Sequence, residues 1–167
     1  MRKSLKRQVF AWGTCFLMLS LFACNNTRKG VVSYHDNRTE CLGSELDGSY
    51  TVRAWGYGRY VKDAKEQAKK TAVYDILFKG VSTGRGGCEQ KPMLMEVNAQ
   101  TKYKDYFDRF FVDGGEYLDY VSMRDRRPGS WQHARQKGGI TCSMVVRVEY
   151  SRLRQRLVED GILKTSF

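Results

Sequence analysis

One segment, residues 124–137, concentrates groups that could recognise an anionic or planar partner. Four arginines and a lysine surround an indole and an imidazole there: Arg124, Arg126, Arg127, Arg135 and Lys137, with Trp131 and His133. Guanidinium groups bind carboxylates and phosphates in a fork geometry, and Arg and Trp are enriched in interaction hot spots. The segment is therefore a candidate binding surface. The alternative interpretation is a solvated hairpin tip with one tryptophan packed back on the sheet.

The cysteines at positions 15, 24, 41, 88 and 142 carry a second kind of chemistry. Cys142 alternates with apolar residues, which predicts a buried side chain that acts as a small hydrophobe. Cys41 precedes the first predicted strand and Cys88 lies in a glycine-rich loop, so both can move to meet. We predict a Cys41–Cys88 disulfide, worth about 4 kcal/mol in the chain-entropy model. The alternative is three free thiols, because sequence alone does not fix connectivity.

The N-terminal segment predicts export and lipidation. Four cations between residues 2 and 7 precede an apolar run from Val9 to Phe22, and Ala23 stands before Cys24. This pattern predicts a signal peptide over residues 1–23. Leu21-Phe22-Ala23-Cys24 resembles the bacterial lipobox, in which the cysteine becomes the lipidated first residue, so Cys24 is the predicted lipidation site. The alternative, a transmembrane anchor, needs roughly 20 apolar residues, and this run is shorter and interrupted by polar ones.

Length and net charge limit the number of domains and the classes of partner for the rest of the chain. Residues 24–44 are predicted to form a polar tether, and residues 45–167 are long enough for a single domain with its own core. The signal segment holds four of the 29 cations and none of the 18 carboxylates, so a formal charge of +7 remains from the total of +11. An exported basic domain does not meet nucleic acid. Lipid phosphates and cell-wall carboxylates are the expected polyanions, and the alternative is that the charge serves solubility.

No catalytic, metal or cofactor motif is found. Gly56-x-Gly58 lacks the third glycine of a dinucleotide fingerprint, and residues 82–87 lack the Lys-Ser/Thr of a phosphate loop. The two histidines, His35 and His133, have no close ligand partner in sequence, so no metal site is predicted. We therefore expect neither an enzyme nor a cofactor.

The hydrophobic pattern predicts an α+β fold, an antiparallel sheet with helices packed on one face. An aromatic stripe on the second helix is expected to belong to the core. The predicted elements are a strand over 49–58, helices over 63–78 and 99–112, a strand over 117–123, a hairpin loop over 124–139, a strand over 140–150 and a helix that begins after Ser151.

Two segments carry a resemblance to known proteins. Thr51–Gly58 and the following Ala-rich helix 63–78 resemble the opening of small bacterial outer-membrane lipoproteins, which is similar to the N-terminal domain of the flagellar T-ring protein. The wider pattern, with Cys41, Cys88 and Glu96-Val-Asn, is similar to envelope lipoproteins of Bacteroidetes. The resemblance implies a periplasmic scaffolding or assembly role without catalytic residues. Asn25 and Asn26 differ from the aspartate that retains lipoproteins in the inner membrane, and residues 25–29 do not resemble the acidic surface-export signal of Bacteroidetes lipoproteins. Together these features favour the periplasmic side of the outer membrane.

These observations leave three hypotheses. The first is a lipid-anchored periplasmic domain with a structural or protein-interaction role, whose partner is another envelope protein. The second is a binder of envelope polyanions through the basic loop 124–137. The third, an enzyme, has no motif in its support.

Overall fold

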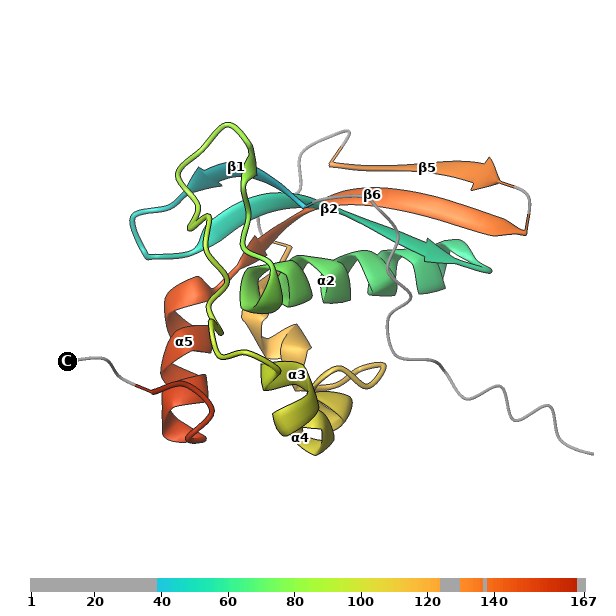
Figure 1. The fold of residues 1–167 in the computed structure, drawn as a ribbon. Helices are drawn as coiled ribbons and strands as arrows, with labels where there is room; N and C mark the ends of the chain where they lie inside the picture. The colour runs from blue at the N-terminus through green and yellow to red at the C-terminus, as the bar shows by residue number, and fades with distance from the viewer. Residues whose placement is uncertain (1–38, 124–129, 137, 165–167) are drawn as a thin grey trace, which may run out of the picture. The chain divides into compact units, whose positions relative to one another are not determined.

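A computed structural model describes residues 39–123, 130–136 and 138–164 of the chain. It confirms the predicted α+β class: a six-stranded, mostly antiparallel sheet with helices beneath one face (Figure 1). The elements are, in chain order, β1 (Glu40–Ser44), β2 (Tyr50–Gly58), α2 (Val61–Phe78), β3 (Thr83–Gly84), α3 (Ala99–Lys102), α4 (Lys104–Phe110), the 3₁₀ helix η2 (Glu116–Tyr120), β4 (Val121–Ser122), β5 (Trp131–Gln136), β6 (Gly139–Val148) and α5 (Tyr150–Glu159).

The centre of the sheet is the antiparallel pair of β2 and β6. The two strands pair over their whole shared length, from Tyr50 opposite Val148 to Gly58 opposite Ile140. Side chains alternate between the two faces of a strand, so β6 buries every second residue: Cys142, Met144, Val146 and Val148. β1 lies beside β2, β3 lies beside β1, and both β4 and β5 pair with the free side of β6.

Helix α2 lies close against β2 because both surfaces are made of small residues. Ala64 and Ala68 are fully buried at the contact. A Cβ added at Gly56 would lie 2.2 Å from the carbonyl oxygen of Ala64 and 2.2 Å from the amide nitrogen of Ala68. Gly56 therefore permits the close approach of strand and helix.

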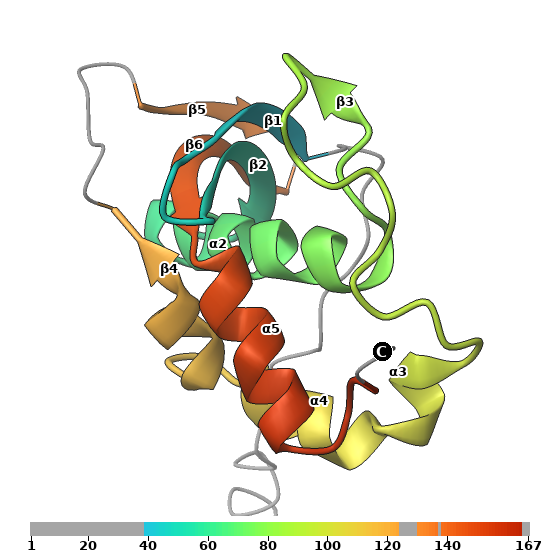
Figure 2. The same cartoon turned by 90° about the vertical axis from the view of Figure 1, so that its left-hand side faces the viewer.

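The other face of α2 packs on an aromatic layer, as the stripe on the second predicted helix indicated. Phe110 and Tyr117 are almost completely buried there, and Phe107 meets Phe78 of α2 edge to face at 4.9 Å between ring centroids. Helix α5 adds Leu153 and Leu157, both fully buried. Figure 2 shows α4 and α5 below α2, on the side away from the sheet. Thus α2 is the central layer of the core.

The domain starts earlier than predicted. Residues 40–44, assigned to the tether, form strand β1, in which Cys41 is buried opposite Val52. Just before it, the Thr39 hydroxyl donates a hydrogen bond of 2.6 Å to the buried carboxylate of Asp75. The segment is polar in sequence, so its strand conformation depends on pairing with β2 rather than on a hydrophobic pattern of its own.

Two other elements differ from the prediction. The helix over 99–112 is divided into α3 and α4 at Tyr103, whose φ and ψ of −107° and 29° are not helical. The strand over 117–123 is mainly the helix η2, and only Val121–Ser122 pairs with β6. Tyr117 and Tyr120 both face the core, and a spacing of three suits a 3₁₀ helix, in which residues i and i+3 eclipse.

Helices α2 and α5 begin earlier than predicted. Helix α2 begins at Val61 with Tyr60 at the N-cap, so Asp63, the predicted first residue, lies inside the first turn. Ser151 lies within α5, and its hydroxyl contacts the carbonyl of Gly48 at 3.2 Å.

Among the described helices, none combines the length and the apolar character needed to cross a membrane. The predicted signal peptide 1–23 and the lipidation site Cys24 lie outside the described residues.

Candidate interaction surface

Six residues of the predicted hairpin loop 124–139 form a strand. β5 (Trp131–Gln136) pairs antiparallel with β6, and Trp131, His133 and Arg135 stand opposite Met144, Cys142 and Ile140. Directly opposite residues share a face, so these three side chains lie on the face that carries the helices. Within the part of the chain that the structure describes, β5 has no strand on its other side and forms an edge of the sheet (Figure 1).

Trp131 is the centre of this surface. Its side chain is 41% exposed, its ring stacks on His133 at 5.4 Å and 16°, and Nζ of Lys65 lies 3.4 Å from the ring centroid. A cation over an indole face is a favourable contact of about 0.5–1 kcal/mol at an exposed site. We call Lys65, Trp131, His133 and Arg135 the edge platform. The ring packs against α2 through Lys65 and remains partly exposed, so the binding surface stays a prediction.

The edge platform is positively charged and has few counter-charges. Lys65 and Arg135 make no ion pair with a carboxylate of the described residues, nor do Arg59 and Lys62 at the same end of the sheet. Some other cations of the described residues do pair, and others, among them Lys91 and Arg154, do not. The paired ones are Arg53, Lys69, Lys70, Lys79, Lys102, Lys104, Arg147 and Arg156. The positive end of the α2 dipole lies at this same end and adds to the potential.

The structure thus brings three of the predicted binding residues, Trp131, His133 and Arg135, onto one strand. The other four, Arg124, Arg126, Arg127 and Lys137, lie outside the described residues. Lys65 was not among the predicted site residues. Its role depends on where α2 crosses the sheet, and the sequence spacing around residue 131 carries no signal of a helix 66 residues earlier.

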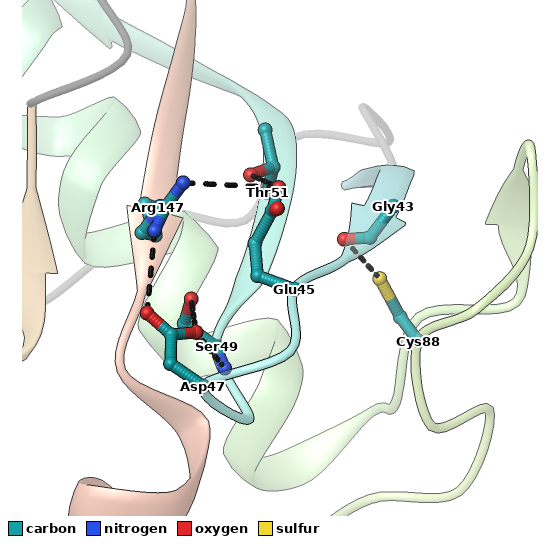
Figure 3. Close-up of polar contacts among 7 residues, drawn as sticks. All are labelled: Gly43, Glu45, Asp47, Ser49, Thr51, Cys88 and Arg147. Atoms are coloured by element: carbon teal, nitrogen blue, oxygen red, sulfur yellow. Dashed lines mark hydrogen bonds and ion pairs between the residues drawn. The ribbon is translucent and has the colours of Figure 1, made fainter.

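Cys41 and Cys88 are joined in a disulfide, as predicted, and Cys142 is free and buried. The bridge ties β1 to the loop after β3. Beside it, Sγ of Cys88 lies 3.8 Å from the carbonyl oxygen of Gly43 (Figure 3). A disulfide sulfur bears no proton, so this is a packing contact.

The turn between β1 and β2 is fixed by Asp47. Its carboxylate accepts hydrogen bonds from the amide and the hydroxyl of Ser49, at 3.0 and 2.5 Å, and lies 3.3 Å from the guanidinium of Arg147 (Figure 3). The hydroxyl bond from Ser49 is the main cause that lowers the pKa of Asp47. Glu45 accepts a bond from Thr51 at 2.9 Å. These contacts hold the turn and leave no group directed at a ligand.

Two groups could suggest catalysis, and neither supports it. Cys142 stands opposite His133, but the thiol is fully buried and burial raises its pKa, which disfavours the nucleophilic thiolate. Buried Lys70 lies 2.6 Å from Asp113, and Tyr117 donates to Glu66. In this second cluster each charge has a partner that links α2 to the segment around η2. The described residues contain no group of three side chains able to hold a metal ion.

Comparison with known proteins adds no relative. No family model matches the sequence, and searches of curated proteins and of solved structures returned no match.

Proposed function

We propose that this chain is a lipid-anchored protein of the bacterial envelope, in the outer membrane and facing the periplasm, and that it binds another envelope protein through the edge platform. A structural or assembly role, rather than catalysis, follows from this proposal. The observation that carries it is the exposed Trp131 on the outermost described strand, where its ring contacts Lys65 and His133.

The partner that suits this surface is an extended protein segment. An edge strand presents a row of unpaired backbone N–H and C=O groups, and a second chain can extend the sheet by pairing with them. In such complexes the backbone supplies affinity, and side-chain contacts supply specificity. Trp131 and Arg135 share one face of β5 and are of the types enriched in hot spots.

Site-specific photocrosslinking in cells tests the binding surface. A photoreactive residue at exposed Ala134 of β5 should crosslink to one partner, and the same group at exposed Arg109 of α4 should not. Combining the Ala134 probe with Trp131→Ala should lower the yield at least about fivefold. Leu46→Ala, which truncates an exposed apolar side chain elsewhere, should leave it unchanged. Equal crosslinking from both positions would refute the assignment.

Labelling tests the anchor separately. A clickable palmitate should label the wild-type chain, and Cys24→Ala should remain unlabelled. Cys15→Ala is the matched control and should label normally. Labelling of Cys24→Ala would remove the lipid anchor from the proposal.

A second candidate function is the binding of envelope polyanions. It is favoured by the cations at the β5 end of the sheet that lack an ion pair among the described residues, Arg59, Lys62, Lys65 and Arg135. Phosphatidylglycerol vesicles should then retain the protein at low salt and release it at about 1 M salt, where the Debye length is about 3 Å. A complex formed by strand pairing should largely survive that wash.

A further inference from the structure

A groove lies away from the edge platform, between a loop and the last helix. Its volume is about 540 Å³, and its walls are residues 89–96 on one side and α5 with residues 162–164 on the other. Figure 2 shows the loop from β3 to α3 running beside α5. No residue of the edge platform lines this groove. The volume lies in the range of ligand sites in proteins, about 300–1,000 Å³.

Both walls are fixed by contacts with the core. The amides of Met93 and Leu94 donate to the carbonyls of Ile76 and Leu77 at 3.0 and 2.9 Å, and the disulfide holds the loop at Cys88. On the opposite wall, the amides of residues 162 and 163 both donate to the carbonyl of Leu157 at 2.9 Å. The groove is therefore preformed, which reduces the ordering cost of binding.

The surface of the groove is apolar with a basic rim. Met93, Leu94 and Ile162 form a buried apolar floor, and Met95 is 71% exposed beside them. The ring of Tyr150 is held by stacking on Tyr50 at 4.4 Å. Flexible, polarisable methionine side chains are typical of surfaces that adapt to peptides.

Three cations stand around this floor: Lys91, Arg154 and Lys164. None makes an ion pair with a carboxylate of the described residues. Two carboxylates share the rim. Glu96 is already bound to Lys102 at 2.5 Å, and Lys164 is one of the charges that lower its pKa, after the hydrogen bond from Lys102. A ligand that carries negative charge beside an apolar group would complement the three cations.

We propose that this groove binds a peptide segment of a partner protein in which an apolar side chain is flanked by carboxylates. The apolar side chain packs on Met95 and the floor, and a carboxylate pairs with Arg154. A peptide fits better than an acyl chain with an anionic head, because the groove is open to solvent and its rim also carries Glu89. A backbone N–H group of a peptide can donate to that carboxylate, whereas an acyl chain cannot.

The experiment is a selection of random 12-residue peptides displayed on phage against the immobilised full chain with its disulfide intact. Enriched peptides should combine acidic residues with Leu, Phe or Met. One of them, fluorescently labelled, then serves as the probe for binding by anisotropy. Arg154→Glu should weaken its binding about tenfold or more. Arg109→Glu, the same change at an exposed position of α4, should change it less than twofold.

Two more variants separate this groove from the edge platform and from general charge. Met95→Ser should weaken binding of the probe severalfold without any change in net charge. Trp131→Ala should leave binding of the probe unchanged. A failed prediction for the groove can therefore be distinguished from a failed prediction for the edge platform. Circular dichroism checks that each variant is folded.

Three results would overturn the proposal. The first is a selection that enriches no acidic, apolar sequence. The second is equal weakening by Arg154→Glu and Arg109→Glu. The third is displacement of the probe by dodecyl phosphate at lower concentration than by the unlabelled peptide, which would assign the groove to a lipid-like amphiphile.

Discussion

The two edges of the sheet differ in how they are closed. At one edge, β3 pairs with β1, Thr83 donates to the carbonyl of Thr39 at 2.8 Å, and the disulfide joins Cys41 to Cys88. At the other edge, β5 pairs with β6 alone among the described residues and carries the exposed Trp131. One edge is bonded to the body of the domain through side chains and a covalent bridge. The other has backbone pairing with a single strand and the contact of Lys65 with Trp131.

This difference suggests that one edge of the sheet stabilises the domain and the other is available for strand pairing. Edge strands that are covered or crosslinked do not pair with other chains, whereas an open edge invites pairing. The closed edge lies where the described chain begins, at Thr39. The open edge lies on the far side of β6, where the described residues contain no further strand beyond β5.

The largest loss of unfolding free energy is expected at the centre of the sheet, which lies between the two edges. Gly56→Val should destabilise the domain by about 4 kcal/mol or more, because its side chain would collide with the backbone of α2. Gly43→Ala on β1 is the matched control. A Cβ at Gly43 meets nothing within 4 Å, so the change should stay within about 0.5 kcal/mol. Urea denaturation measures both. Equal losses of unfolding free energy in the two variants would mean that α2 does not pack closely against β2 at Gly56.

Removal of the disulfide should weaken the closed edge. The double variant Cys41→Ala/Cys88→Ala should lose about 2–4 kcal/mol of unfolding free energy, because the bridge constrains the unfolded chain. Crosslinking from Ala134 should be unaffected in conditions where the variant is folded. If the photocrosslink is lost together with the disulfide, the two edges are coupled and the comparison fails.

Some of these elements could be predicted from the sequence because the residues that determine them lie within the element itself. β6 and α2 were predictable because alternating apolar residues and alanines at i, i+4 spacing record burial within the element itself. The disulfide was predictable because only three cysteines remain after residue 24, and one of them alternates with apolar residues along β6.

The strands at both edges could not be predicted in the same way. β1 and β5 are polar, and each becomes a strand because a partner, β2 or β6, supplies its hydrogen bonds. The contact of Lys65 with Trp131 depends on the crossing of α2 over the sheet. The groove joins residues 89–96 to residues 150–164, and neither segment alone shows a binding pattern.

A smaller effect should measure how firmly the open edge is held. A double-mutant cycle with Lys65→Met and Trp131→Leu should give a coupling free energy of about 0.5–1 kcal/mol, the size of an exposed cation–π contact. Each variant alone should destabilise the domain by no more than about 1 kcal/mol. A coupling of zero in thermal or urea unfolding would show that Lys65 does not order the indole ring in solution.

The smallest effect is expected at the turn next to the closed edge, and it depends on pH. Asp47 has a lowered pKa in the folded domain, first because of the hydroxyl of Ser49 and further because of Arg147. A carboxyl whose folded pKa is lower than its unfolded pKa contributes stability above the unfolded value, and this contribution is lost as the pH falls through the folded value.

Unfolding free energy should therefore decrease more for the wild type than for Asp47→Asn between pH 5 and pH 2, because only the wild type protonates this group. Ser49→Ala, which removes the main cause, should reduce the same difference while Asp47 remains. Parallel pH profiles for the wild type and Asp47→Asn would contradict the assignment and leave the turn held by its backbone hydrogen bonds, from Glu45 to Ser49 and from Gly48 to Glu45.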